Sequence, residues 1–311
     1  MESLNRKEFL QTLAAAGAGA FFFTEGVADV MAQQAQGKQY NLVAVMGGEP
    51  EEMFNAAIKQ MGGMARFVKP GMKVTIKPNI GWDKTPEMAA NTNPLLVAAI
   101  IKACQAAGAK EVTVFDHTCD QWRRCYQSSG IEDAARKLGA IVMPGNEERY
   151  YRQIQLPNGK NMKSAMVHQA ILDSDVWINV PVMKTHSGAK MTLCMKNHMG
   201  IVLDRQFMHM HDLQQTIADI CSISKPAVLN IVDSYRAMKS NGPRGRSEAD
   251  VVTPKALFMG TDIVAVDTMA SKFFGQITQI PLEHIVHLAN GQAMGLGTMT
   301  PASTEIKRIK M

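Results

Sequence analysis

The sequence predicts an α/β fold, with a mostly parallel sheet that carries helices on both faces. Apolar runs of strand length alternate with segments of helical periodicity over residues 41–115, in the order strand, helix, strand, helix, strand. Several of these runs end directly in polar or glycine-containing loops. The composition, with 46% hydrophobic and 20% charged residues among 311, is that of a globular chain with a substantial core. Such alternation is typical of parallel strands joined by right-handed helical crossovers.

The first half of the chain supplies the clearest elements. We expect three strands, each followed by a turn or polar signal, and two helices between them: strands at 41–46, 72–77 and 111–115, and helices at 50–64 and 94–107. The helix at 50–64 carries apolar residues at helical spacing. Asn93 followed by Pro94 is a helix-start signal, an N-cap and then a first-turn proline.

The second half is predicted in the same way, with two departures from simple alternation. The expected elements are a helix at 130–138, strands at 141–143 and 176–180, helices at 190–199 and 212–220, strands at 227–232 and 255–259, a helix at 262–274, another from Pro281, and an edge strand at 305–309. Residues 149–156 alternate in polarity and reach Pro157-Asn158-Gly159, which predicts a small appended β-hairpin subdomain. Residues 240–250 (SNGPRGRSEAD) are rich in glycine, proline and arginine, which favours a mobile lid or ligand loop.

Residues 1–32 have the pattern of an export signal. Arg6-Lys7-Glu8-Phe9-Leu10 precedes an apolar run at 13–23 that is too short to span a bilayer, and small residues near Ala32 suit cleavage. The arrangement is similar to a twin-arginine signal with Lys7 in place of the second arginine. We therefore expect a periplasmic protein with a single domain at 33–311 and no membrane contact beyond the signal. Ordinary secretion and an uncleaved anchor remain open alternatives.

Charge favours a small anionic ligand as the partner. The whole chain carries +5 (33 Lys and Arg against 28 Asp and Glu), and removal of residues 1–32 leaves 31 against 24, which is +7. No Lys/Arg run is interleaved with aromatic residues, so nucleic acid is not indicated.

Familiar cofactor motifs are missing from the sequence. Neither a G-x-G-x-x-G fingerprint nor a P-loop lysine occurs, so NAD and ATP are disfavoured, and there is no G-x-S-x-G nucleophile elbow. The five cysteines include no C-x-x-C pair, which argues against an iron–sulfur cluster. Cys119 and Cys125 are close enough in sequence to pair in an oxidising compartment, whereas Cys104, Cys194 and Cys221 suit a core.

The stretch at 176–200 organises the expected site. A buried strand at 176–180 leads into a polar loop with Lys184, Thr185 and His186, and a helix with Lys196 and Asn197 follows. Open α/β sheets bind ligands where strands end in loops of this kind. Lysines beside a helix N-terminus suit an anion.

Several polar segments resemble the DUF362 family, a domain of unknown function. The matching segments are Lys77-Pro78-Asn79, Thr92-Asn93-Pro94, Gly108-Ala109-Lys110, residues 179–186 (NVPVMKTH), Lys196-Asn197-His198-Met199-Gly200, Asp233, Gly242-Pro243 and residues 262–267. They extend over nearly all of the mature chain. The most specific part of the match is the pair of motifs Pro-x-x-Lys-Thr-His and Lys-Asn-x-x-Gly. Relatives in the family often carry iron–sulfur cysteines, which this chain lacks. The resemblance thus supports these segments as the site and does not identify the reaction.

The site hypothesis assigns a role to each candidate residue. Lys184 and Lys196 hold an anion, because a lysine that ends a buried strand needs a charged partner, and His186 moves a proton. The further ligand-binding candidates are Lys77, Asn79, Thr185, Asn197 and Arg244. Structural alternatives are internal pairing of Lys77, Lys184 and Lys196 with Asp83, Asp116 or Asp233, a purely orienting hydrogen bond for His186, and a solvated loop around Arg244.

A metal site is a second hypothesis. Asp233, at a predicted strand end, could hold a divalent metal with His209 or His211, near the start of the helix at 212–220. Met191, Met195 and Met199, with nearby histidines, also resemble a soft-metal set for copper. Their spacing of four residues is that of a core-facing helical stripe, which is the interpretation we favour.

The sequence therefore predicts an exported enzyme that acts on a small carboxylate- or phosphate-bearing substrate at a lysine- and histidine-lined site. The rival is a non-catalytic periplasmic metal- or anion-binding protein that uses the Met/His cluster. Substrate and reaction do not follow from the sequence.

Overall fold

The computed structural model describes residues 39–311, so the predicted export signal lies outside the described residues. Within this part of the chain an eleven-stranded mixed sheet forms the centre, and a two-stranded sheet lies beside it. The main path of the large sheet has the order β13-β1-β12-β10-β7-β2-β3-β4, with β8, β9 and β11 attached through β10. Most neighbours are parallel, while β12 runs antiparallel to both β1 and β10.

The strands are short and mostly buried. Their bounds are β1 Leu42–Met46, β2 Lys73–Pro78, β3 Glu111–Val114, β4 Ile141–Val142, β5 Tyr151–Gln155, β6 Ser164–His168, β7 Val176–Val180, β8 Val182–His186, β9 Lys190–Thr192, β10 Leu229–Met238, β11 Val251–Val252, β12 Ala256–Gly260 and β13 Ile306–Lys310.

The α-helices differ widely in length. Their bounds are α4 Pro50–Gln60, α5 Pro94–Ala106, α6 Trp122–Ser128, α7 Ile131–Lys137, α8 Gln169–Leu172, α9 Cys194–Asn197, α10 Arg205–Met210, α11 Leu213–Cys221, α12 Ile263–Thr278 and α13 Val286–Ala293. Short 3₁₀ turns are η1 Met64–Arg66, η2 Pro86–Met88, η3 Glu148–Tyr150, η4 His198–Ile201, η5 Glu248–Asp250, η6 Leu282–His284 and η7 Ser303–Glu305.

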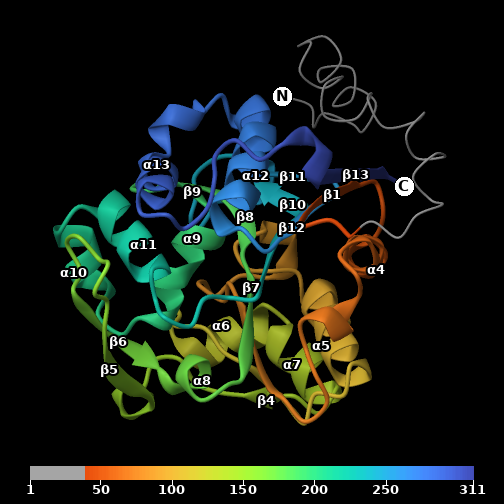
Figure 1. Cartoon of the computed structure of the whole chain (residues 1–311), viewed down its shortest axis with the longest axis horizontal. Coiled ribbons are helices and arrows are strands. Elements are labelled where there is room, and N and C mark those ends of the chain that lie inside the picture. Colours follow the sequence, from red (N-terminus) through yellow and green to blue (C-terminus); the bar gives the residue numbers. More distant parts are fainter. Residues whose placement is uncertain (1–38) are drawn as a thin grey trace.

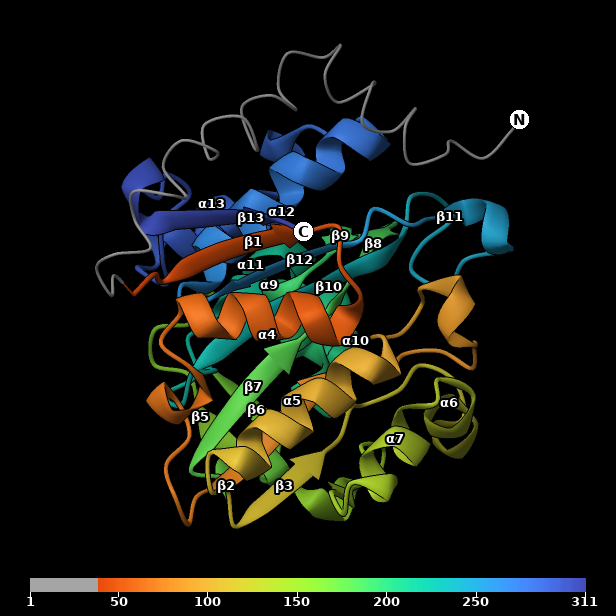
Figure 2. The ribbon, with the colours of Figure 1, turned by 90° about the vertical axis from the view of Figure 1, so that its right-hand side faces the viewer.

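Helices cover both faces of the sheet, as predicted. Helices α4 and α5 pack on one face, over β1, β2, β3 and β12, and Figure 2 shows them in front of the strands. Helices α9, α11, α12 and α13 lie on the other face, and the hairpin of β5 and β6 stands at its edge (Figure 1). Two separate apolar clusters fill the two sides, one under α4 and α5 and one under α12 and its neighbours.

The element predictions are largely confirmed. The strand at 176–180 has the predicted bounds, Asn93 caps α5 by accepting from the Leu95 amide, and the appended hairpin is formed by β5 and β6. The predicted edge strand is also present, as β13 beside β1.

Two local predictions around the site are wrong. The polar segment at 184–186, expected to be a loop, is the second half of strand β8, which pairs with β9 and β10. The expected helix at 190–199 begins as strand β9 and becomes helical only at Cys194. Both errors are tertiary in origin, because β8 is extended by pairing with β10 and β9 is extended by pairing with β8, on residues whose local pattern does not indicate a strand.

No helix in the described range 39–311 is long and apolar enough to cross a membrane.

Candidate functional site

The carboxyl ends of neighbouring parallel strands place several predicted residues together. Strand β2 ends at Lys77 and Pro78 with Asn79 just beyond it, and Asp116 lies two residues after the end of the adjacent parallel strand β3. Strand β7 runs parallel on the other side of β2 and passes through Pro181 into β8, which carries Lys184. This is the edge at which open α/β sheets bind ligands.

A buried polar network forms the base of the site. The Lys77 ammonium lies 2.7 Å from Asp116 Oδ1 and donates to Asn197 Oδ1 at 2.7 Å. Asn197 is fixed further, because its amide donates to Asn179 Oδ1 at 2.9 Å. Asp116 Oδ2 accepts from the Ile80 amide at 2.6 Å. Lys77 therefore has an internal carboxylate partner, and of the two interpretations of Lys77 the structure matches the internal pairing.

Lys184 is buried, and no carboxylate of residues 39–311 pairs with it. Its ammonium donates to Asn79 Oδ1 at 2.7 Å and to the Ala90 carbonyl at 2.5 Å, and its side chain is 2% exposed. Burial lowers the pKa of Lys184 to about 7, and the nearby positive charge of Lys196 contributes to this shift. Two of the three ammonium protons are used, so one N–H remains for a ligand.

Lys196 is half-buried and forms no ion pair or hydrogen bond with any residue in the range 39–311. Burial lowers its pKa to about 8, and positive charge on Arg205 and Lys77 acts in the same direction. Arg205 also has no carboxylate partner within that range; its guanidinium donates to the His117 and Thr118 carbonyls at 2.9 and 2.7 Å.

The charges at this edge therefore do not balance. Three cationic groups, Lys184, Lys196 and Arg205, have no carboxylate partner in the described part of the chain, and the carboxylate of Asp116 is already engaged by Lys77. Neighbouring cations without counter-charges attract an anion.

His186 is held in one tautomer by its own turn. Its Nδ1 accepts from the amides of Gly188 and Ala189, each at 3.1 Å, so Nε2 carries the proton. Burial lowers the pKa of His186 to about 2, with Lys196 and Lys184 acting in the same direction. The imidazole is neutral at physiological pH and can donate from Nε2.

The glycine-rich loop at 240–250 adjoins the site. Asp250 organises it by accepting from the Ser240 hydroxyl and the Arg246 amide, each at 2.7 Å. Thr185 of β8 holds the loop beside the site, since its hydroxyl accepts from the Gly242 amide at 3.1 Å. Arg244 is exposed and lies 3.7 Å from Asp120, so the structure does not place it among the buried lysines.

The predicted metal ligands are not brought together. Asp233 lies inside β10, not at a strand end, and its carboxylate accepts from the Asn93 and Tyr235 amides at 2.7 and 3.1 Å. His209 and His211 are exposed on and after α10, and His211 stacks on Phe207. No group of three or more His, Cys, Asp or Glu residues in the described chain could hold a metal ion. The local prediction failed because β10 continues five residues beyond Asp233.

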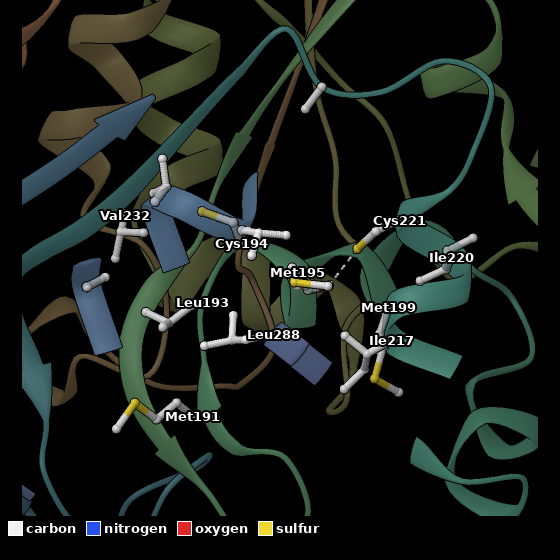
Figure 3. Close-up of a cluster of buried hydrophobic side chains, with 14 of the residues drawn as sticks. Met191, Leu193, Cys194, Met195, Met199, Ile217, Ile220, Cys221, Val232 and Leu288 are labelled. Atoms are coloured by element: carbon white, nitrogen blue, oxygen red, sulfur yellow. Dashed lines mark hydrogen bonds between the residues drawn. The ribbon is translucent and has the colours of Figure 1, made fainter. Parts of the chain in front are cut away.

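The methionines at 191, 195 and 199 are core residues, as favoured. Figure 3 shows them among Leu193, Ile217 and Leu288, and their exposed fractions are 1%, 0% and 3%. Met191 lies on a strand and not on a helix, so the predicted helical stripe is wrong although its burial is confirmed. Cys104, Cys194 and Cys221 are buried as expected, and Cys119 and Cys125 are free thiols.

Two residues near the site were not anticipated. Arg205 opens α10 directly after its N-cap Asp204, a start signal that is visible in the sequence. Cys119 is exposed, and Arg205 donates to its sulfur at 3.5 Å. Only the fold shows that this segment lies beside the lysines.

Comparisons with known proteins relate the chain to a family and to two individual proteins. The chain is 25% identical over 257 residues to the thylakoid-associated protein sll1697 of Synechocystis sp., covering 80% of this chain and 75% of that protein. Among solved structures, the lactate racemase apoprotein from Thermoanaerobacterium thermosaccharolyticum matches with a TM-score of 0.43 and 13% identity, over 77% of this chain and 58% of that one, which is less than two thirds of its length. The model of a family described as "Domain of unknown function (DUF362)" matches residues 74–272. The chain belongs to the DUF362 family.

Proposed function

We propose that the protein is an exported enzyme that binds a small carboxylate- or phosphate-bearing substrate between Lys184 and Lys196. One observation carries the proposal: the ammonium groups of Lys184 on β8 and Lys196 on α9 act on each other electrostatically, and neither has a carboxylate partner in the described chain. An unpaired buried cation is costly, and a bound anion removes that cost.

The neighbouring groups support a proton-transfer role for Lys184. A lysine with a pKa near 7 exchanges its proton readily at neutral pH, as a general acid or base must. His186, to which the sequence assigned that role, has too low a pKa to take up a proton there. We assign to His186 the donation of a hydrogen bond from Nε2, and to Asn79 and Asn197 the positioning of Lys184 and Lys77.

The rival function, metal handling by the Met/His cluster, has less support. It requires His198, His209 and His211 to converge with methionine side chains. His198 is buried and its Nδ1 hydrogen-bonds to the Cys194 carbonyl, while His209 and His211 are exposed. A non-catalytic anion-binding protein uses the same lysines and differs from the enzyme only in turnover.

Equilibrium dialysis of the purified protein against labelled orthophosphate and labelled acetate tests the binding step. We expect one site per chain, lost in Lys184→Met and in Lys196→Met while the far-ultraviolet circular dichroism is retained. Lys102→Met is the matched control, because Lys102 is an exposed lysine paired with Glu51. Unchanged binding by both site variants, or no binding by the unaltered protein, would exclude the proposed site.

A further inference from the structure

Thr192 lies directly across from Lys184. Strands β8 and β9 are antiparallel, and their register pairs Lys184 with Thr192. Side chains of directly opposite residues stand on the same face of a sheet, with β carbons about 4.5–5.5 Å apart. The next residue back, Met191, lies in the core under α12, which fits the alternation of faces along a strand. The Thr192 hydroxyl thus shares a face with the Lys184 ammonium.

The hydroxyl of Thr192 has no hydrogen-bond partner in the part of the chain that the structure describes. The residue is 4% exposed, and its Oγ1 makes no hydrogen bond with the described residues. A buried hydroxyl without a partner carries an uncompensated desolvation cost, so most such groups in folded proteins are satisfied. Nothing in the packing of β9 explains why a threonine is preferable here to an isosteric valine.

We infer that Thr192 is a third anion-binding residue, and that it makes the site select a phosphate group over a carboxylate. The inference rests on the proposed function and names its substrate class. Lys184 has one N–H left, Lys196 has all three, and Thr192 adds one O–H, so three side chains from β8, β9 and α9 supply separate donors. A phosphate monoester presents three terminal oxygens to such a set, whereas a carboxylate presents two.

The hydroxyl is fully covered, so the ligand reaches it only when a neighbouring flexible side chain shifts. The stem of Lys184 stands on the same face and has four rotatable carbons. This requirement makes the hydroxyl a selective donor, because only a group that displaces the covering side chain gains its hydrogen bond.

Three variants test the inference in the full chain, with labelled orthophosphate and labelled acetate as probes in equilibrium dialysis. Thr192→Val removes the hydroxyl at constant shape, Thr192→Ser keeps a hydroxyl, and Thr268→Val is the control. Thr268 is also a buried threonine whose hydroxyl has no partner among the described residues, but it lies on α12 and faces no lysine across a strand pair. Because the valine variant loses no hydrogen bond with residues 39–311, it should fold.

We expect Thr192→Val to weaken orthophosphate binding about tenfold or more, the value of one hydrogen bond to a charged group. Acetate binding should change by less than about threefold, and Thr192→Ser and Thr268→Val should bind orthophosphate as the unaltered protein does. Unchanged orthophosphate binding by Thr192→Val, or equal weakening for both anions, overturns the inference. If the role of Thr192 is overturned but Lys184→Met still abolishes binding, the proposed anion site is retained without it. If the unaltered protein binds neither anion, the proposed function and the role of Thr192 are both excluded.

Discussion

The ammonium of Lys77 lies 2.7 Å from the carboxylate of Asp116, and both side chains are almost completely buried. The pair joins the ends of β2 and β3, and Asn197 of α9 accepts a second hydrogen bond from the same ammonium. Burial lowers the pKa of Lys77, while Asp116 raises it. The pair is linked to Lys184 through Asn197 and Asn79, and it uses a carboxylate that could otherwise neutralise a neighbouring lysine.

Replacement of Asp116 should therefore destabilise the fold strongly. Asp116→Asn leaves the Lys77 ammonium buried without its counter-charge, for which a loss of about 3–5 kcal/mol of unfolding free energy is typical. Urea denaturation measures the loss. The double variant Lys77→Met, Asp116→Leu should recover much of it, because no charge is then left unpaired. A loss below about 1 kcal/mol in Asp116→Asn would show that the pair does not stabilise the protein.

Much of this site could be predicted from the sequence because it follows from parallel topology. Lys77, Asn79 and Asp116 follow apolar strand runs, and parallel strands end at a common edge. The sequence could not show which lysine is paired internally. Lys77 and Lys184 have the same local pattern, and only the order of the strands brings Asp116 next to Lys77.

What could not be predicted has a tertiary origin. The segment at 184–186 is too polar to resemble a strand, and it is extended because β8 pairs with β10 on one side and with β9 on the other. The ten-residue length of β10 places Asp233 inside a strand, where backbone amides satisfy its carboxylate. The pairing of Lys184 with Thr192 exists only in this hairpin, so no helical prediction for 190–199 could have found it.

Gly200 should be intolerant of any side chain. A β carbon at this position would lie 2.0 Å from Asp116 Oδ1 and 2.5 Å from Lys77 Nζ, so the buried pair would have to move. We expect Gly200→Ala to lower the unfolding free energy by about 1–3 kcal/mol, as other overpacked buried sites do. Gly81→Ala is the control, because its β carbon would come no closer than 3.8 Å to another residue. Equal urea midpoints for the two variants would contradict this account.

The Lys196 ammonium, which we propose binds the anion, should lower the free energy of unfolding of the anion-free protein. Its pKa is near 8 in the folded chain and 10.5 ordinarily, so the unfolded chain holds the proton more tightly and the ammonium disfavours folding at neutral pH. We expect Lys196→Met to raise the thermal midpoint by roughly 2–4 °C while it abolishes anion binding. Lys102→Met, which removes a surface pair, should leave the midpoint unchanged or slightly lower. A lower midpoint in Lys196→Met would show that the ammonium has a stabilising partner.

Alkylation of Cys119 can probe the positive electrostatic potential of the lysine site. Cys119 is the exposed cysteine of the five, and Arg205 donates to its sulfur. Unpaired cations attract anionic reagents. The ratio of the iodoacetate rate to the iodoacetamide rate should therefore be higher for Cys119 than for free cysteine. Mass spectrometry of the labelled peptide measures both rates. We expect Lys196→Met to lower the rate ratio and orthophosphate to protect the thiol. A ratio equal to that of free cysteine would mean that the site has no net positive potential.

Anion affinity should fall as pH rises, because the lysines bind an anion only in their charged form. Lys184 and Lys196 have pKa values near 7 and 8, so both are mostly charged at pH 6 and mostly neutral at pH 9. A bound anion raises both pKa values, and binding near pH 7.5 should therefore take up protons from the buffer. Sulfate is the suitable ligand, since its own charge is constant over this range, and calorimetry in two buffers of different ionisation enthalpy measures the uptake. In Lys196→Ala any residual affinity should decline in a single step that lies above pH 7, because loss of the Lys196 charge raises the pKa of Lys184. A sulfate affinity that is constant between pH 6 and 9 would exclude these two lysines as its ligands.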